Sequence, residues 1–188
     1  MTTRESIADL IQKIALQDQD AFQSLYTAFS RRIFSFVKNH LHCDEMAKEV
    51  VVDTMLAVWR SAGTFGGRSK PEVWLLGIAH NKLLDRLDKE RRHQADYLED
   101  LGDWQSLLGS CDDCEQERMR QDLGEGVRLC MDKLGIQHRE SLTLVYFDQL
   151  TVAQASEVTG VPEGTIKTRL FHAKQKLKNC VNKLKGLL

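Results

Sequence analysis

The side chains best suited to metal or redox chemistry are the cysteines, and one pair of them has a recognisable spacing. Cys111 and Cys114 form a CxxC pair. A structural zinc site needs four ligands, and neither a second CxxC nor an HxxxH follows. Cys43, Cys130 or His42 would have to complete such a site. Cys111 and Cys114 are therefore candidates for metal binding or redox sensing, with incidental cysteines as the alternative, and we expect no cofactor.

The other chemistry-bearing residues do not assemble an enzyme. The sequence has no Walker A loop, no HExxH helix and no GxSxG turn. His80 and His138 lack candidate partners in the sequence. We therefore expect a binding protein rather than an enzyme.

The cysteine count and the apolar stretches indicate the compartment. Five irregularly spaced cysteines argue against a disulfide framework. Glu5 and Asp9 interrupt the pattern of a secretory signal, and the apolar stretch at 73–79 is too short to cross a bilayer. We expect a cytoplasmic protein without a disulfide framework and without membrane contact.

The motif most typical of binding lies at residues 151–177. Thr151 and Gln154 predict a capping box that opens a short helix, and Gly160 supplies the positive φ that ends it. Pro162 then starts a second helix. One face of that helix is apolar at three- and four-residue steps, through Ile166, Leu170, Ala173 and Leu177. Two short helices joined by a tight turn form a helix-turn-helix.

The opposite face of the second helix is basic, as a helix in the major groove of DNA requires. Such helix pairs also occur as plain structural units, but the basic face favours DNA binding. The candidate DNA-contacting residues are Thr165, Lys167, Thr168, Arg169, Phe171, His172 and Lys174. Lys174, Lys176 and Lys178 are best placed for phosphates.

The first half of the chain has helical periodicity. Apolar residues at three- and four-residue steps predict helices over 7–14, 22–37 and 47–58. A glycine-rich break follows at 61–70. Few residues favour strands, and we expect an all-α fold.

The helix after this break has its own start signal and a basic end. Ser69 and Glu72 predict a capping box, with Pro71 in the first turn. Trp74, like Trp59 before the break, is expected in the core. The basic residues toward its end are Lys82, Arg86, Lys89, Arg91 and Arg92. They could bind DNA or only complement the helix dipole.

The charge distribution divides the chain into three parts. Residues 1–92 carry 14 basic and 12 acidic side chains, residues 93–125 carry 2 and 10, and residues 126–188 carry 10 and 5. This pattern predicts two small helical domains, 1–92 and 126–188, joined by an acidic linker at 93–125. The C-terminal domain is the one with the helix-turn-helix.

The two blocks together resemble the extracytoplasmic-function (group 4) sigma factors of bacterial RNA polymerase. Residues 47–59 (AKEVVVDTMLAVW) look like the helix that grips the clamp helices of the largest polymerase subunit. Residues 64–69 (TFGGRS) and 74–81 (WLLGIAHN) look like the promoter-melting loop and the helix after it. Residues 164–174 are similar to the recognition helix for the minus-thirty-five element.

This resemblance implies a function, partners and site residues. It implies a sigma factor that binds core RNA polymerase and promoter DNA, directs promoter recognition, melting and initiation, and is held by an anti-sigma factor. The implied polymerase contacts are Glu49, Val52, Asp53 and Leu56. The implied minus-ten contacts are Phe65, Arg68, Ser69, Asn81, Lys82 and Arg86. The acidic linker would follow the RNA path of the polymerase and imitate RNA.

The sequence departs from the pattern of these sigma factors at several positions. Val52 and Met55 replace the usual glutamine and phenylalanine, and His172 and Lys174 replace arginines. We expect these changes to retune promoter choice. Two alternatives are a helix-turn-helix regulator that binds DNA without polymerase, and a helical adaptor that binds only protein. The first block argues against the former, and the basic recognition face argues against the latter.

Overall fold

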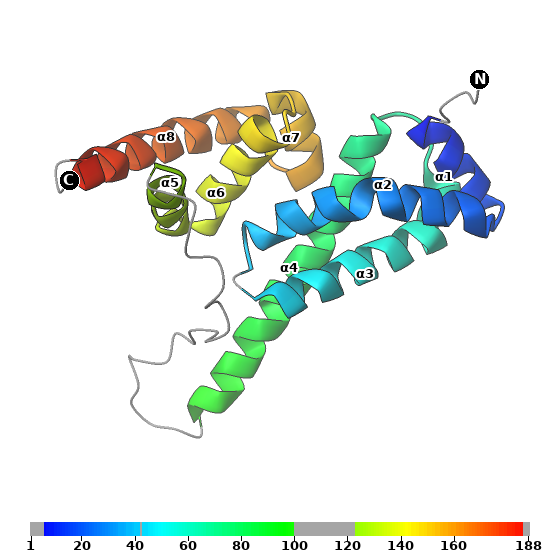
Figure 1. Ribbon diagram of the computed structural model, residues 1–188, viewed down its shortest axis with the longest axis horizontal. Helices are drawn as coiled ribbons and strands as arrows, with labels where there is room; N and C mark the ends of the chain where they lie inside the picture. Colours follow the sequence, from blue (N-terminus) through cyan, green and yellow to red (C-terminus); the bar gives the residue numbers. More distant parts are fainter. Residues whose placement is uncertain (1–5, 42, 100–122, 186–188) are drawn as a thin grey trace. The chain divides into compact units, whose positions relative to one another are not determined.

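The structure is a computed structural model that describes residues 6–41, 43–99 and 123–185. The chain divides into two compact units, residues 1–108 and 109–188. The described residues are helical, with no strand among them, which confirms the expected all-α fold (Figure 1). Among them, no helix is both long and apolar enough to cross a membrane.

The first unit packs four helices around one core. They are α1 (Ile7–Ala15), α2 (Gln19–Lys38), α3 (Asp44–Ser61) and α4 (Pro71–Glu99), with a 3-10 turn η1 (Ala62–Thr64) after α3. α2 and α3 lie side by side in opposite directions, and α4 packs against both (Figure 1). The apolar residues whose spacing predicted these helices pack together in this core. Its largest fully buried side chains are Ile11, Ile14, Leu25, Ile33, Phe36, Met55, Leu75, Leu76 and Leu83.

Local hydrogen bonds set the helix boundaries of the first unit. Ser6 and Asp9 form a reciprocal capping box at α1, and Asp18 accepts a bond from the N–H of Ala21 at the start of α2. Lys38 and Asp44 form an ion pair across the turn between α2 and α3, which holds the pKa of the Asp44 carboxyl below its usual value.

The start of α4 differs from the prediction by one residue. The Lys70 carbonyl accepts from the N–H groups of Val73 and Trp74, so Lys70 precedes the helix and Pro71 is its first residue. Glu72 then occupies the second helical position, where it cannot form the box predicted with Ser69. Proline favours the first position, which explains the shift.

The second unit is built on α8 (Glu163–Lys185). Three helices pack on it: α5 (Leu123–Asp132), α6 (Ile136–Leu142) and α7 (Val152–Thr159). A π-helical turn, η2 (Thr143–Phe147), extends α6. The bounds expected for the acidic linker, 93 and 125, therefore fall within α4 and α5. Cys111 and Cys114 lie outside the described residues.

The helix-turn-helix forms as the sequence predicts. The N–H of Gln154 donates to the Thr151 hydroxyl at 3.2 Å, and the Gln154 side chain accepts from the N–H of Thr151 at 2.9 Å. Gly160 ends α7 with φ +68°. Pro162 accepts from Thr165 and Ile166, so it precedes α8 rather than starting it as predicted.

A side-chain bond in this turn was not predicted. The Ser156 hydroxyl donates to the Val161 carbonyl at 2.6 Å and ties α7 to the turn that follows it. The apolar face of α8 is buried at Ile166, Leu170 and Ala173, which confirms the predicted pattern. Because this face is buried, the opposite face of α8 is exposed.

One disulfide forms in the described part of the chain, although the sequence argues against a disulfide framework. Cys130 in α5 and Cys180 in α8 form a disulfide with a Cα–Cα distance of 5.8 Å across 50 residues of sequence. Irregular spacing could not reveal this pair, because only the packing of α5 on α8 brings the two residues together. Cys130 is thereby removed as a metal ligand in this state.

We expect this disulfide to stabilise the second unit strongly. Closing a loop of about 50 residues contributes on the order of 4 kcal/mol through the entropy of the unfolded chain. The double variant Cys130→Ser, Cys180→Ser should therefore exchange its α5 and α8 amide hydrogens faster, as measured by mass spectrometry on the full chain. The matched control is Cys43→Ser, which removes a free thiol and should leave exchange in α5 and α8 unchanged. Equal exchange in the wild type and the double variant would contradict the prediction.

We also expect Gly160→Ala to destabilise the second unit by about 1–2 kcal/mol. A Cβ atom at Gly160 would meet nothing within 4 Å, so the cost arises from the positive φ alone. Gly164→Ala is the matched control, because this position is helical, also has open space and should gain helix propensity. Urea unfolding followed by circular dichroism measures both variants, and equal midpoints would be inconsistent with this account.

Candidate nucleic-acid interface

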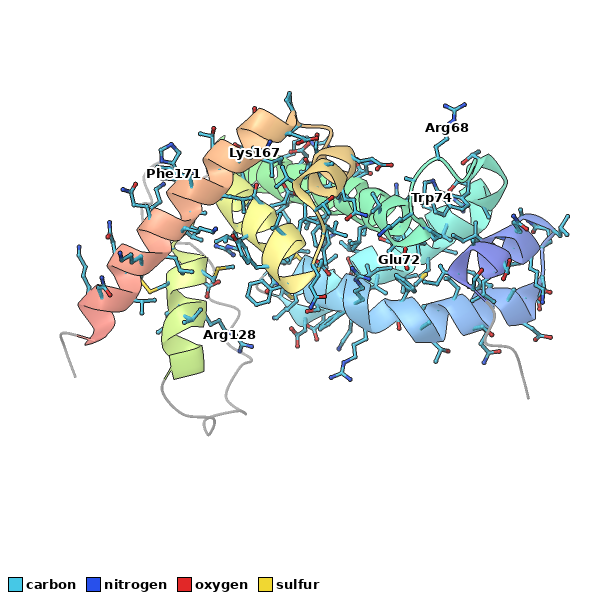
Figure 2. The ribbon with its side chains drawn as sticks, turned by 90° about the horizontal axis from the view of Figure 1, so that it is seen from above. Arg68, Glu72, Trp74, Arg128, Lys167 and Phe171 are labelled. Carbon is cyan, nitrogen blue, oxygen red and sulfur yellow. A yellow bond between two sulfur atoms is a disulfide. The ribbon has the colours of Figure 1, made fainter. Side chains whose placement is uncertain are left out.

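The exposed face of α8 carries the side chains predicted to read DNA. Thr165, Lys167, Thr168, Phe171, His172 and Lys174 are exposed, and Arg169 is half-buried. Phe171 is 63% exposed, a large fraction for an apolar ring, and projects from the side of α8 that faces away from α6 (Figure 2). An exposed aromatic ring among basic groups suits contact with a base.

Some of these side chains have partners within the second unit. Lys167 pairs with Glu163 one turn earlier at 3.4 Å, and the Thr168 hydroxyl donates to the Gly164 carbonyl at 2.9 Å. The Lys174 ammonium lies 4.8 Å from the centre of the Tyr146 ring of η2. These contacts fix side-chain directions on α8. They are exposed, so each contributes little to stability.

His138 is a feature of this face that sequence reasoning missed. Its ring, in the first turn of α6, lies 6.4 Å from the ring of His172 on α8. The statement that His138 lacks a partner is therefore wrong, because α6 packs on α8. Burial lowers the pKa of His138, and the charges of Lys176, His172 and Arg169 lower it further.

The glycine-rich segment of the first unit forms an exposed loop between η1 and α4. The N–H of Phe65 donates to the Ala62 carbonyl at 3.1 Å, and Gly67 adopts φ +67°. Arg68 projects away from the ribbon (Figure 2). Ser69 is half-buried.

The aromatic side chain of this loop is not free in the structure. The Phe65 ring is half-buried and lies 5.2 Å from the Trp74 ring of α4. Trp59 makes a similar contact, edge-on to Phe22 at 5.1 Å. Both tryptophans are half-buried and contact another ring. The Phe65 ring is therefore partly covered by Trp74 in the structure.

The candidate DNA contacts on α4 differ in availability. Asn81 is exposed, and Lys82 pairs with Asp85 on the same helix at 3.3 Å. Arg86 is held more tightly. Its guanidinium contacts Glu49 of α3 at 3.3 Å and Glu90 of α4 at 3.2 Å, and its side chain is 20% exposed.

The four candidate polymerase contacts lie on one face of α3. Glu49, Val52, Asp53 and Leu56 follow helical spacing and are all exposed. Val52 is 47% and Leu56 is 44% exposed, so two apolar side chains alternate with two carboxylates along this face. Next to them is a shallow groove between α2 and α3. It is lined by Tyr26, Ser30, Arg31, Phe34, Lys48, Val51 and Val52.

No group of three or more metal-ligating side chains occurs in the described part of the chain. Chemistry at Cys111 and Cys114 stays a prediction, because both lie outside that part.

Comparisons with known proteins agree with the two-unit division. The family model for Sigma-70 region 2 matches residues 25–93, and the model for Sigma-70 region 4 matches residues 125–177. The first match covers most of the first unit, and the second covers α5 through most of α8.

Relatives match over nearly the whole chain. An ECF RNA polymerase sigma factor SigK of Mycobacterium sp. (strain JLS) is 32% identical over 173 residues, covering 92% of this chain and 89% of the relative. A SigK of Mycobacterium tuberculosis (strain ATCC 25177 / H37Ra) is 28% identical, with 92% of each chain covered.

Solved structures share the fold. CnrH, solved with the cytosolic domain of CnrY, matches with a TM-score of 0.66 and 18% identity over 95% of this chain and 99% of that one. The sigma factor RpoE of Bartonella quintana, solved with the anti-sigma factor NepR, matches with a TM-score of 0.67 and 19% identity over 86% and 96%. The family models and the relatives together show that this chain belongs to the ECF sigma factors of RNA polymerase.

Proposed function

We propose that this sigma factor binds core RNA polymerase with the exposed face of α3 and recognises a two-part promoter with α4 and α8. The observation that carries this proposal is the presence of two different surfaces on one chain. One is an acidic and apolar helix face in the first unit. The other is a basic helix-turn-helix in the second.

The α3 face suits a protein partner with basic and apolar groups. Glu49 and Asp53 provide carboxylates one turn apart, and Val52 and Leu56 provide exposed apolar area beside them. Burial of about 25 cal/mol per Å² of apolar surface would drive association, while the carboxylates select the orientation. We assign this face to the polymerase.

The loop and α4 suit a melted minus-ten element. Phe65 offers a ring for a flipped base, and Arg68 and Ser69 offer polar contacts. Asn81 and Lys82 extend this surface along α4. Because Phe65 already contacts Trp74, base capture would exchange one ring contact for another.

Arg86 has a different role from the other candidates in this proposal. Its two carboxylate partners, Glu49 and Glu90, occupy the guanidinium that DNA would need. Arg86 is better suited to brace α3 against α4, and so to hold the polymerase-binding face and the melting surface in a fixed relation.

The α8 face suits the minus-thirty-five element. Thr165, Lys167, Thr168, Phe171 and His172 lie in its first three turns, where a recognition helix meets base edges. The half-buried Arg169 is a candidate contact beside them. The lysines further along, Lys174, Lys176 and Lys178, would meet phosphates.

Regulation and location follow from the same proposal. RpoE was solved with the anti-sigma factor NepR, and an anti-sigma factor is the expected regulator here. The protein would act in the cytoplasm, where polymerase and promoters are. It would have no enzymatic activity of its own, since the polymerase supplies the chemistry. The acidic residues at 93–125 would follow the RNA path.

Run-off transcription on a promoter library, with and without core polymerase, tests the function. We expect initiation from a shared two-part promoter only when core and this chain are both present. DNA binding without core, and no initiation with it, would instead identify an autonomous regulator. If the isolated chain and the holoenzyme both lack salt-dependent DNA binding, the protein-only adaptor would be favoured.

A double-mutant cycle tests the bracing role of Arg86. We expect Arg86→Gln and Glu49→Gln to be non-additive in free energy of unfolding by about 0.5–1 kcal/mol, because the pair is partly buried and joins two helices. The control cycle uses Lys82→Gln and Asp85→Asn, a pair within one helix, with an expected coupling of about 0.3 kcal/mol. The bracing role would be contradicted if the effects of Arg86→Gln and Glu49→Gln on the free energy of unfolding are additive and only Arg86→Gln lowers DNA affinity. Arg86 would then be a DNA contact.

A further inference from the structure

A cluster of basic groups at the crossing of α6 and α8 extends beyond the recognition helix. It consists of His138 from α6 and of Arg169, His172 and Lys176 from α8. The rings of His138 and His172 lie 6.4 Å apart at an interplanar angle of 79°. Arg169 and Lys176 are close enough to act electrostatically on His138.

The position of His138 is fixed by its own helix. Its N–H donates to the Gly135 carbonyl at 2.9 Å, and a Cβ at Gly135 would lie 3.5 Å from Nδ1. The side chain is half-buried. The ring is therefore held between the start of α6 and the side of α8 rather than extended into solvent.

The neighbouring charges favour an anion at this cluster. The groups that act on His138 are Lys176, His172 and Arg169, all on α8 and all basic. The adjacent Arg139 faces the other way, because its guanidinium donates to the carbonyls of Asp132 and Leu134. An anion beside the cluster would relieve the mutual repulsion of these groups.

We propose that His138, when protonated, contacts a backbone phosphate of promoter DNA, so that α6 contributes to the minus-thirty-five interface together with α8. DNA phosphate is the ligand because the His172 ring of this cluster also contacts the exposed Phe171 ring of the recognition face, with 5.5 Å between the ring centres. The inference rests on the proposed function and adds to it one residue and a pH dependence.

The pH dependence has a definite sign. In the free protein, burial and the neighbouring cations hold the pKa of His138 below its ordinary value of 6.5. A bound phosphate favours the charged ring and raises this pKa. The gain in DNA affinity is then fully present below the pKa of the free protein. It is lost as the pH rises through the pKa of the complex.

Holoenzyme binding to a fluorescent duplex carrying the upstream promoter element tests the inference. We expect His138→Gln to weaken binding about fivefold at a pH of about 5.5, as for one partly exposed charge pair, and to change nothing near pH 8. The dependence of log K on log salt should become shallower by about 0.9 at the lower pH only. His138→Lys should retain the affinity and lose the His138 part of the pH dependence.

His172→Gln is the matched control, because it removes the other histidine of the cluster and leaves His138 in place. Comparing each variant with the wild type at the same pH removes the pH dependence of core polymerase itself. If wild-type holoenzyme binds and His138→Gln keeps the wild-type affinity and salt slope at both pH values, this inference alone is overturned. If wild-type holoenzyme shows no sequence-selective binding, the proposed function fails and the inference fails with it.

Discussion

A helix at the surface of a small bundle buries one face and exposes the other, and this constraint decides what each functional helix of this protein displays. Ile166, Leu170 and Ala173 are buried along one side of α8, so Lys167 and Phe171 must lie on the exposed side. The same holds for α3, where burial of Val51, Met55 and Val58 turns Glu49, Val52 and Asp53 outward. The recognition surfaces are thus consequences of core packing. Substitutions in either core would redirect them without touching a contact residue.

Hydrogen bonds and ion pairs then fix the positions of turns and helices that apolar packing alone does not determine. Arg139 is 6% exposed and donates to the Asp132 and Leu134 carbonyls at 2.6 and 3.3 Å, which closes the turn between α5 and α6. Burial lowers the pKa of Arg139, and the nearby Asp132 carboxylate partly offsets this effect. In the first unit, Arg86 joins α3 to α4 in a comparable way. In each unit, an arginine that reads as a surface cation in the sequence serves as an internal connector.

Local signals predicted most of the fold, and contacts distant in sequence account for what was missed. Apolar spacing gave the helices, and the Thr151 and Gln154 box with Gly160 gave the helix-turn-helix, because these features depend on neighbours within five residues. The disulfide between Cys130 and Cys180 and the approach of His138 to His172 depend on packing between elements, which spacing does not encode. Most candidate site residues on α3 and α8 are exposed, whereas Phe65, Ser69 and Arg86 of the first unit are half-buried. The partner of Arg86 on α3 was not predicted, because this ion pair depends on which helix packs against α4.

The disulfide holds α8 in place beyond the end of its buried apolar face. The last fully buried residue of that face is Ala173, and Leu177 is only half-buried. Beyond this point the side chains of α8 include exposed lysines, which do little to hold the helix in place. The bond from Cys180 to α5 anchors α8 there, about two turns past Ala173. Lys174, Lys176 and Lys178 therefore lie between two anchors, one apolar and one covalent. The backbone of α8 is therefore fixed on both sides of these lysines.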